Sequence, residues 1–194
     1  MNTYQKILRF DDVTKFRLVN AFIFAVGFNL FVPVLLDLKG EYLAAYAISL
    51  FMIAEQLIVK TNRYFVNNFS LDRLYKIGIF IHFFFVSTAL MYFWDPFWMV
   101  LMEGTLSVIV IAFFGAYSIK LNNYLTEEYP KDMSEFQIVR NSTWADGLLI
   151  GLGLTTVITF FFPVSYALGL FVIYNSGFTV WMILNWNFYK ERNL

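Results

Sequence analysis

The chain alternates long apolar stretches with short polar connections, and six of the stretches are long enough to cross a membrane as helices. A hydrocarbon core of about 30 Å requires roughly 20 mostly apolar residues in helical form. The predicted spans are Leu18–Leu36, Leu43–Val59, Ile77–Trp94, Phe97–Ile119, Gly147–Phe162 and Tyr166–Tyr189. They are too long for barrel strands and do not alternate apolar with polar at every second residue. We therefore expect an all-α integral membrane protein, with residues 1–194 forming one six-helix transmembrane domain.

The lysines and arginines predict how these spans are oriented. Connections rich in Lys and Arg remain in the cytoplasm during insertion. Of the 14 such residues, only Lys39 lies in the connections that follow the first, third and fifth spans. We therefore expect both termini in the cytoplasm, the bacterial inner (plasma) membrane as the location, and consecutive helices as antiparallel neighbours.

Composition and charge exclude several classes of function. The chain is 59% hydrophobic and 14% charged, whereas soluble domains carry roughly 25% charged residues. This composition indicates that the chain is surrounded by the lipid bilayer. A net charge of zero gives no reason to expect a nucleic-acid partner. The absence of cysteine excludes disulfides and thiolate metal sites, and a lone histidine does not build a zinc site. We expect no enzyme activity, no cofactor and no metal.

Local patterns resemble one half of a major facilitator superfamily transporter. Residues 70–76 read Ser-Leu-Asp-Arg-Leu-Tyr-Lys and occupy the place of the Asp-Arg motif between the second and third helices of that family. Residues 122–130 resemble the segment of that family in which the fourth helix ends and an amphipathic connection on the cytoplasmic side begins. Residues 141–153 resemble its Gly-rich fifth helix. Tyr75 replaces a glycine of the motif, and Glu103 stands near the place of an arginine in the fourth helix.

The resemblance implies an architecture and a partner. The resemblance implies that Asp72 and Arg73 belong to a conformational-latch motif. Transporters of that family have twelve helices in two such halves, so a chain of six implies a homodimer or a second membrane subunit.

Three ionisable residues lie within the predicted spans, where charge costs at least about 2.5–3.5 kcal/mol. They are Glu55, His82 and Glu103. Glu55 and His82 share a predicted depth on neighbouring helices and could form a proton-relaying pair; alternatively they make a structural polar contact, or Glu55 reaches toward Lys60. Glu103 either lines a cavity or reaches outer water.

Two asparagines accompany helix-loosening residues near the middle of predicted spans. Asn29 follows Gly27 and precedes Pro33, and Asn175 precedes Gly177. Transporter sites are often built this way, although glycine and proline are also common in ordinary transmembrane helices. The candidate substrate or ion pathway therefore comprises Asn29, Glu55, His82, Glu103 and Asn175.

Small residues in the fifth span predict close helix packing. Gly147, Gly151 and Thr155 recur at four-residue spacing and share one helix face. Thr143 and Asp146 have the spacing of a capping box, which predicts that the fifth helix starts there. The preceding segment, residues 130–140, reads as a separate interfacial amphipathic helix.

These features favour membrane transport of a small solute by a half-transporter that dimerises, with Glu55 and His82 available for proton coupling. The alternative is a non-transporting membrane helper, either the substrate-capture subunit of a multi-component transporter or a scaffold or immunity protein. A homodimer favours the first function, and a complex with an unrelated subunit favours the second.

Overall fold

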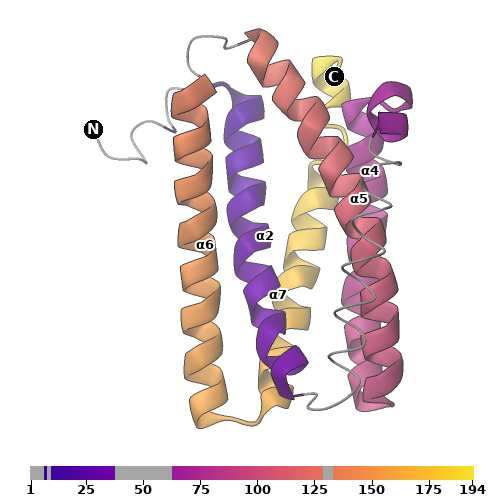
Figure 1. Ribbon diagram of the computed structural model, residues 1–194, viewed down its shortest axis with the longest axis vertical. Helices are drawn as coiled ribbons and strands as arrows, with labels where there is room; N and C mark the ends of the chain where they lie inside the picture. The colour runs from indigo at the N-terminus through magenta and orange to yellow at the C-terminus, as the bar shows by residue number, and fades with distance from the viewer. Residues whose placement is uncertain (1–6, 8–9, 38–62, 129–132) are drawn as a thin grey trace. The chain divides into compact units, whose positions relative to one another are not determined.

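The computed structural model describes residues 7, 10–37, 63–128 and 133–194, and these residues form long helices (Figure 1). No strand occurs among them. In chain order the elements are α2 (Asp12–Asp37), α4 (Leu71–Ala89), the 3-10 helix η1 (Leu90–Phe93), α5 (Pro96–Glu128), α6 (Met133–Phe161), α7 (Val164–Leu184) and the 3-10 helix η2 (Lys190–Arg192). Residues 63–68 are also helical. The expected all-helical class is confirmed for this part of the chain.

Four helical segments within the described residues are long and apolar enough to cross a membrane. They are Asp12–Leu30, Leu71–Phe93, Ser134–Phe161 and Val164–Leu184. Their lengths and hydropathy support a membrane protein. The predicted span Leu43–Val59, with Glu55, lies outside the described residues, so the count of six spans and the single six-helix domain stay predictions.

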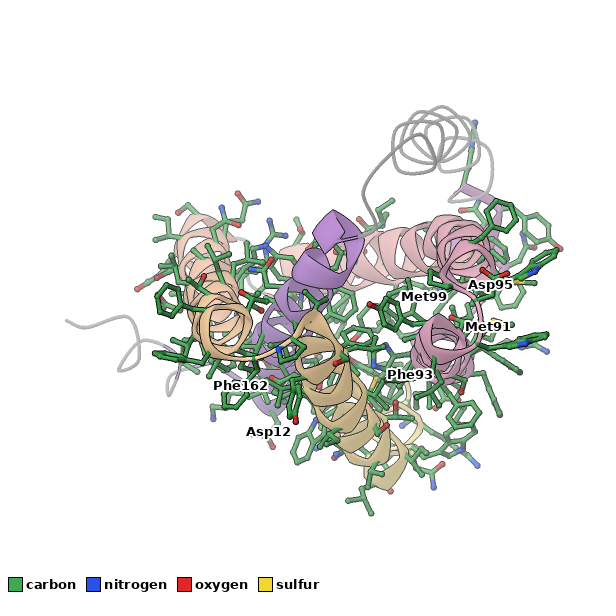
Figure 2. All side chains as sticks on the ribbon, turned by 90° about the horizontal axis from the view of Figure 1, so that it is seen from below. Asp12, Met91, Phe93, Asp95, Met99 and Phe162 are labelled. Carbon is green, nitrogen blue, oxygen red and sulfur yellow. The ribbon has the colours of Figure 1, made fainter. Side chains whose placement is uncertain are left out.

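The outer surface of these helices suits a lipid solvent. Large apolar side chains are widely exposed, with Trp94 80% and Phe160 79% accessible. Figure 2 shows side chains projecting from the helices on all sides, with Phe93 and Phe162 among those labelled. Because lipid covers apolar surface without the penalty that water imposes, this exposure is expected of membrane helices.

Helix α4 begins at Leu71, ahead of the predicted start at Ile77. Ser70 caps its first turn, because the Ser70 Oγ accepts a hydrogen bond from the Arg73 N–H at 3.2 Å. The predicted span begins only after the charged residues Asp72, Arg73 and Lys76, but a capped helical turn can include charged residues. The helix is therefore longer than its apolar segment.

Helix α6 is continuous from Met133 to Phe161, so the predicted helix start at Thr143 and Asp146 is wrong. The Thr143 hydroxyl donates to the Val139 carbonyl oxygen at 2.8 Å, which is the bond a threonine makes inside a helix. The described part of the predicted interfacial helix, residues 133–140, forms the first turns of α6.

Contacts divide the chain into two compact units. Unit 1 comprises Met1–Val34 and Tyr124–Tyr174, and unit 2 comprises Leu35–Asn123 and Asn175–Leu194. The buried core of unit 1 includes Leu18, Ala25, Val26, Leu30, Leu168 and Phe171. That of unit 2 includes Leu74, Ile79, Met99, Leu121, Phe178 and Tyr189. Helix α7 contributes its first half to unit 1 and its second half to unit 2.

Candidate functional site

In unit 1, Asn29 lies where α2 contacts α6. Its side-chain amide Nδ2 donates to the Leu148 carbonyl oxygen at 2.6 Å, and the Thr155 hydroxyl donates to the Asn29 carbonyl oxygen at 3.1 Å. Interhelical hydrogen bonds of this kind hold membrane helices together. The structure therefore places this candidate pathway residue in a joint between two helices.

Gly147 and Gly151 bring the two backbones of this joint together. A Cβ added at Gly147 would lie 2.7 Å from the Phe22 carbonyl oxygen, and one at Gly151 would lie 2.6 Å from the Val26 carbonyl oxygen. Neither position leaves room for a methyl group. The small-residue face of α6 is thus turned toward α2 within one chain.

The second group of polar residues lies in unit 2, at the middle of α4 and α7. His82 is 1% exposed, and it makes a hydrogen bond with the backbone of Asn175. Asn175 and Thr179 are also buried, and the Thr179 hydroxyl donates to the Asn175 carbonyl oxygen at 2.9 Å. We call His82, Asn175 and Thr179 the central polar cluster.

The earlier start of α4 changes the depth at which His82 lies. It is roughly 16 Å along the helix from Leu71, at 1.5 Å per residue, rather than close to the helix start. Asn175 is at a similar distance from the start of α7. The two residues were predicted as separate candidates at different depths, and the structure brings them together.

Aromatic rings surround the imidazole. The Phe178 ring stands edge-on to it with ring centroids 5.3 Å apart, and the Phe85 ring is stacked with it at 6.4 Å. These contacts fix the plane of the His82 ring between α4 and α7. The two remaining candidates cannot be placed beside it: Glu55 lies outside the described residues, and Glu103 lies in α5 with its side chain outside the described part.

Unit 2 also contains a tyrosine cluster that was not predicted from the sequence, comprising Tyr75, Tyr117 and Tyr189. The Tyr75 hydroxyl donates to the Met182 carbonyl oxygen at 3.2 Å, and the hydroxyls of Tyr117 and Tyr189 are hydrogen-bonded to each other. The Tyr75 and Tyr189 rings meet edge-on at 5.3 Å. Tyr75 and His82 are seven residues apart, a spacing that places both side chains on one face of a helix. This spacing could have indicated that Tyr75 is buried together with His82.

The latch-motif residues begin α4, and each has an aromatic or charged neighbour. The Lys76 Nζ lies 2.9 Å from the Asp72 Oδ2, one helical turn away. The Arg73 guanidinium lies over the Phe69 ring, 5.2 Å from its centroid. The Asp72 N–H donates to the Leu194 carbonyl oxygen at 3.3 Å.

Further cations gather at the same end of unit 2. The Lys120 ammonium donates to the Val66 and Phe69 carbonyl oxygens, where positive charge suits the end of a helix. The Arg192 guanidinium lies over the Phe188 ring, 3.8 Å from its centroid. We call this region, with Arg73, Lys76, Lys120 and Arg192, the basic end of unit 2.

The central polar cluster brings together an imidazole, an amide and a hydroxyl, which are groups that donate and accept hydrogen bonds. Within the part of the chain that the structure describes, no three His, Cys, Asp or Glu side chains come together as a metal site would require. Comparisons with protein-family models, with curated proteins and with solved structures found no match.

Proposed function

We propose that this chain is a membrane transport protein for a small solute and that the central polar cluster lies on the solute path. One observation carries the proposal: His82 and Asn175 are buried together at the middle of two apolar helices of spanning length. Polar and ionisable residues at membrane depth usually face a partner or a transported species. His82 supplies a titratable group at that depth, which makes it available for proton coupling.

The proposed working unit is a homodimer of half-transporters of the major facilitator type. Each chain contributes six spans, including Leu43–Val59, with both termini in the cytoplasm. Two bundles then rock around a site near the bilayer midplane. The resemblance of residues 70–76 and 141–153 to that family supports this arrangement.

Solute flux into proteoliposomes tests the transport function. Vesicles containing the protein are shifted to hyperosmotic glycerol, urea or alanine, and light scattering follows their re-swelling. We expect protein-dependent re-swelling with at least one solute and its loss in the variant His82→Ala/Asn175→Ala. The control is Ser87→Ala, because the Ser87 hydroxyl bonds to the Phe83 carbonyl oxygen of its own helix. Re-swelling no faster than in protein-free vesicles, for every solute, would contradict the proposal.

The mass of the protein in a lipid nanodisc, with and without crosslinking, tests the working unit. A stable dimer supplies the second half that the proposal requires. A monomer, or a complex with an unrelated membrane subunit, would overturn the homodimer and favour the helper function instead.

A further inference from the structure

The face of α4 that lies opposite its buried face changes from cationic to apolar along the helix. Arg73, Lys76, Phe80, Phe83 and Phe84 follow one another at a spacing that places their side chains along one line of the helix surface. Arg73 is exposed, and each of the three phenylalanines is more than half exposed. We call these five residues the α4 stripe.

Trp186, which follows the end of α7, contacts both the cationic and the apolar part of the α4 stripe. The Lys76 Nζ lies over the Trp186 ring, 5.4 Å from its centroid, and the Phe80 ring meets the same ring edge-on at 5.8 Å. Tryptophan is enriched where the hydrocarbon meets the lipid headgroups. The two contacts therefore place the cations of the stripe at the level of the headgroups and its phenylalanines at the level of the acyl chains.

The Arg73 guanidinium is positioned by a ring and not by a counter-charge. It lies over the Phe69 ring, 5.2 Å from its centroid, and within the part of the chain that the structure describes it forms no ion pair with a carboxylate. An aromatic ring attracts a cation but offers no oxygen lone pair. The guanidinium can therefore still donate to the oxygen atoms of an anion, which phosphate accepts in the geometry that arginine favours.

The last residues of the chain add positive charge beside the α4 stripe. The Asp72 N–H donates to the Leu194 carbonyl oxygen, so residues 190–194 lie at the start of α4 (Figure 1). Lys190 and Arg192 are exposed in this segment. Cations therefore outnumber carboxylates among the described side chains at this end of unit 2, with Arg73, Lys76, Lys120, Lys190 and Arg192 against Asp72 and Glu191.

The helix starts of unit 1 show no such excess of positive charge. Lys15 lies 3.8 Å from Asp12, and Arg17 is buried. The described charged side chains around the starts of α2 and α6 are evenly divided between the two signs: Asp11, Asp12, Lys15, Arg17, Glu135 and Arg140. Anionic groups are therefore attracted to the basic end of unit 2 more strongly than to these helix starts.

We propose that the α4 stripe, together with Trp186, is a binding site for an anionic phospholipid. The lipid phosphate accepts hydrogen bonds from Arg73 and Lys76, and the acyl chains cover the phenylalanines of the stripe. The positive charge selects an anionic headgroup. The apolar continuation of the stripe selects a lipid over a soluble anion, because only a lipid covers both parts. The site requires a membrane location and does not depend on the proposed transport function.

Quenching of Trp186 fluorescence by brominated lipids tests the site. The other tryptophans are first replaced by phenylalanine, in the variants Trp94→Phe, Trp98→Phe, Trp144→Phe and Trp181→Phe combined. The protein is reconstituted in phosphatidylcholine with the same fraction of brominated phosphatidylglycerol or of brominated phosphatidylcholine, with bromine near the carbonyl end of the chains. Bromine quenches only nearby rings, so comparing the two lipids measures how far the anionic lipid is enriched beside Trp186. We expect an enrichment of at least about threefold, which falls as salt is added.

Charge removal identifies the residues that hold the headgroup. Arg73→Gln/Lys76→Gln should reduce the enrichment to that of random mixing. Lys15→Gln/Arg140→Gln is the matched control, because it removes two cations from unit 1 and should leave the enrichment unchanged. Each variant is compared with itself in the two brominated lipids, so a change in the brightness of Trp186 cancels.

Equal quenching by the two brominated lipids would overturn the site. Enrichment that persists in Arg73→Gln/Lys76→Gln, or that falls equally in the unit 1 control, would replace the site by a diffuse attraction between the protein and anionic lipid. Loss of enrichment on addition of inorganic phosphate would show that the ligand is a soluble anion. Lys76→Gln leaves Asp72 unpaired, so Arg73→Gln alone is a second variant that disturbs no ion pair, and it should lower the enrichment about twofold.

Discussion

The glycines of this chain have opposite structural roles, which the sequence alone does not separate. Gly147 and Gly151 allow the α2 backbone to approach α6, whereas Gly78 faces open space on a buried helix face. Four-residue spacing was enough to predict a packing face on the fifth span. Nothing in the local sequence distinguishes an isolated glycine that leaves room from one that a bend or contact requires.

The α2–α6 contact predicts how single methyl groups change stability. Gly151→Ala places its Cβ 2.6 Å from the Val26 carbonyl oxygen, so we expect it to destabilise the protein by about 1–3 kcal/mol through overpacking. Gly153→Ala, on the open face of α6, should instead gain up to about 1 kcal/mol of helix propensity. Thermal unfolding in detergent measures both. Equal midpoints for the two variants would show that α2 does not approach α6 this closely.

His82 and Asn175 show what could be predicted of the candidate site. His82 was identified as an ionisable residue within an apolar span, where it is costly unless it has a function or a partner, and Asn175 was identified as a polar residue close to the helix-loosening Gly177. Their contact could not be predicted, because it depends on which helices pair in three dimensions. The depth of His82 was also misplaced, because the predicted span began at Ile77 and α4 begins at Leu71.

At the scale of helices, among those that the structure describes, apolar length predicted that a helix exists better than it predicted where the helix begins and ends. Helix α5 continues to Glu128 beyond the predicted end at Ile119, and α6 includes the polar segment before Gly147. Hydropathy reports where a helix enters the hydrocarbon. It does not report where the helix ends, which caps and local hydrogen bonds decide.

The continuity of α6 is tested by a proline within its polar half. Ser142→Pro would remove a backbone hydrogen bond and clash with the preceding turn, so we expect a loss of about 3 kcal/mol. Ser142→Ala should change stability little. If the helix instead began at Thr143, the proline would fall in the connection before it and be tolerated. Circular dichroism and thermal unfolding of the two variants decide between these arrangements.

At the scale of the whole molecule, the basic connections predict which sides of the membrane the helix ends face. Exposed single cysteines can report this in intact cells. Trp94→Cys and Pro163→Cys should react with an impermeant maleimide added outside, whereas Asn68→Cys and Arg192→Cys should react only after the membrane is permeabilised. The reverse labelling pattern would show that the orientation of the protein is opposite to the predicted one. Labelling of Trp94→Cys and Pro163→Cys from different sides of the membrane would show that the predicted number of spans is wrong.

Helix α7 belongs to both units, and this has a consequence for biosynthesis. Tyr174, the last residue of unit 1, donates its hydroxyl to the Ile23 carbonyl oxygen, and the next residue, Asn175, bonds to His82 in unit 2. During translation α4 emerges from the ribosome long before α7. The histidine therefore enters the bilayer before its asparagine has been made, and neither unit closes until α7 is inserted. Quality-control proteases that survey nascent membrane proteins would meet an incomplete His82 environment throughout that interval.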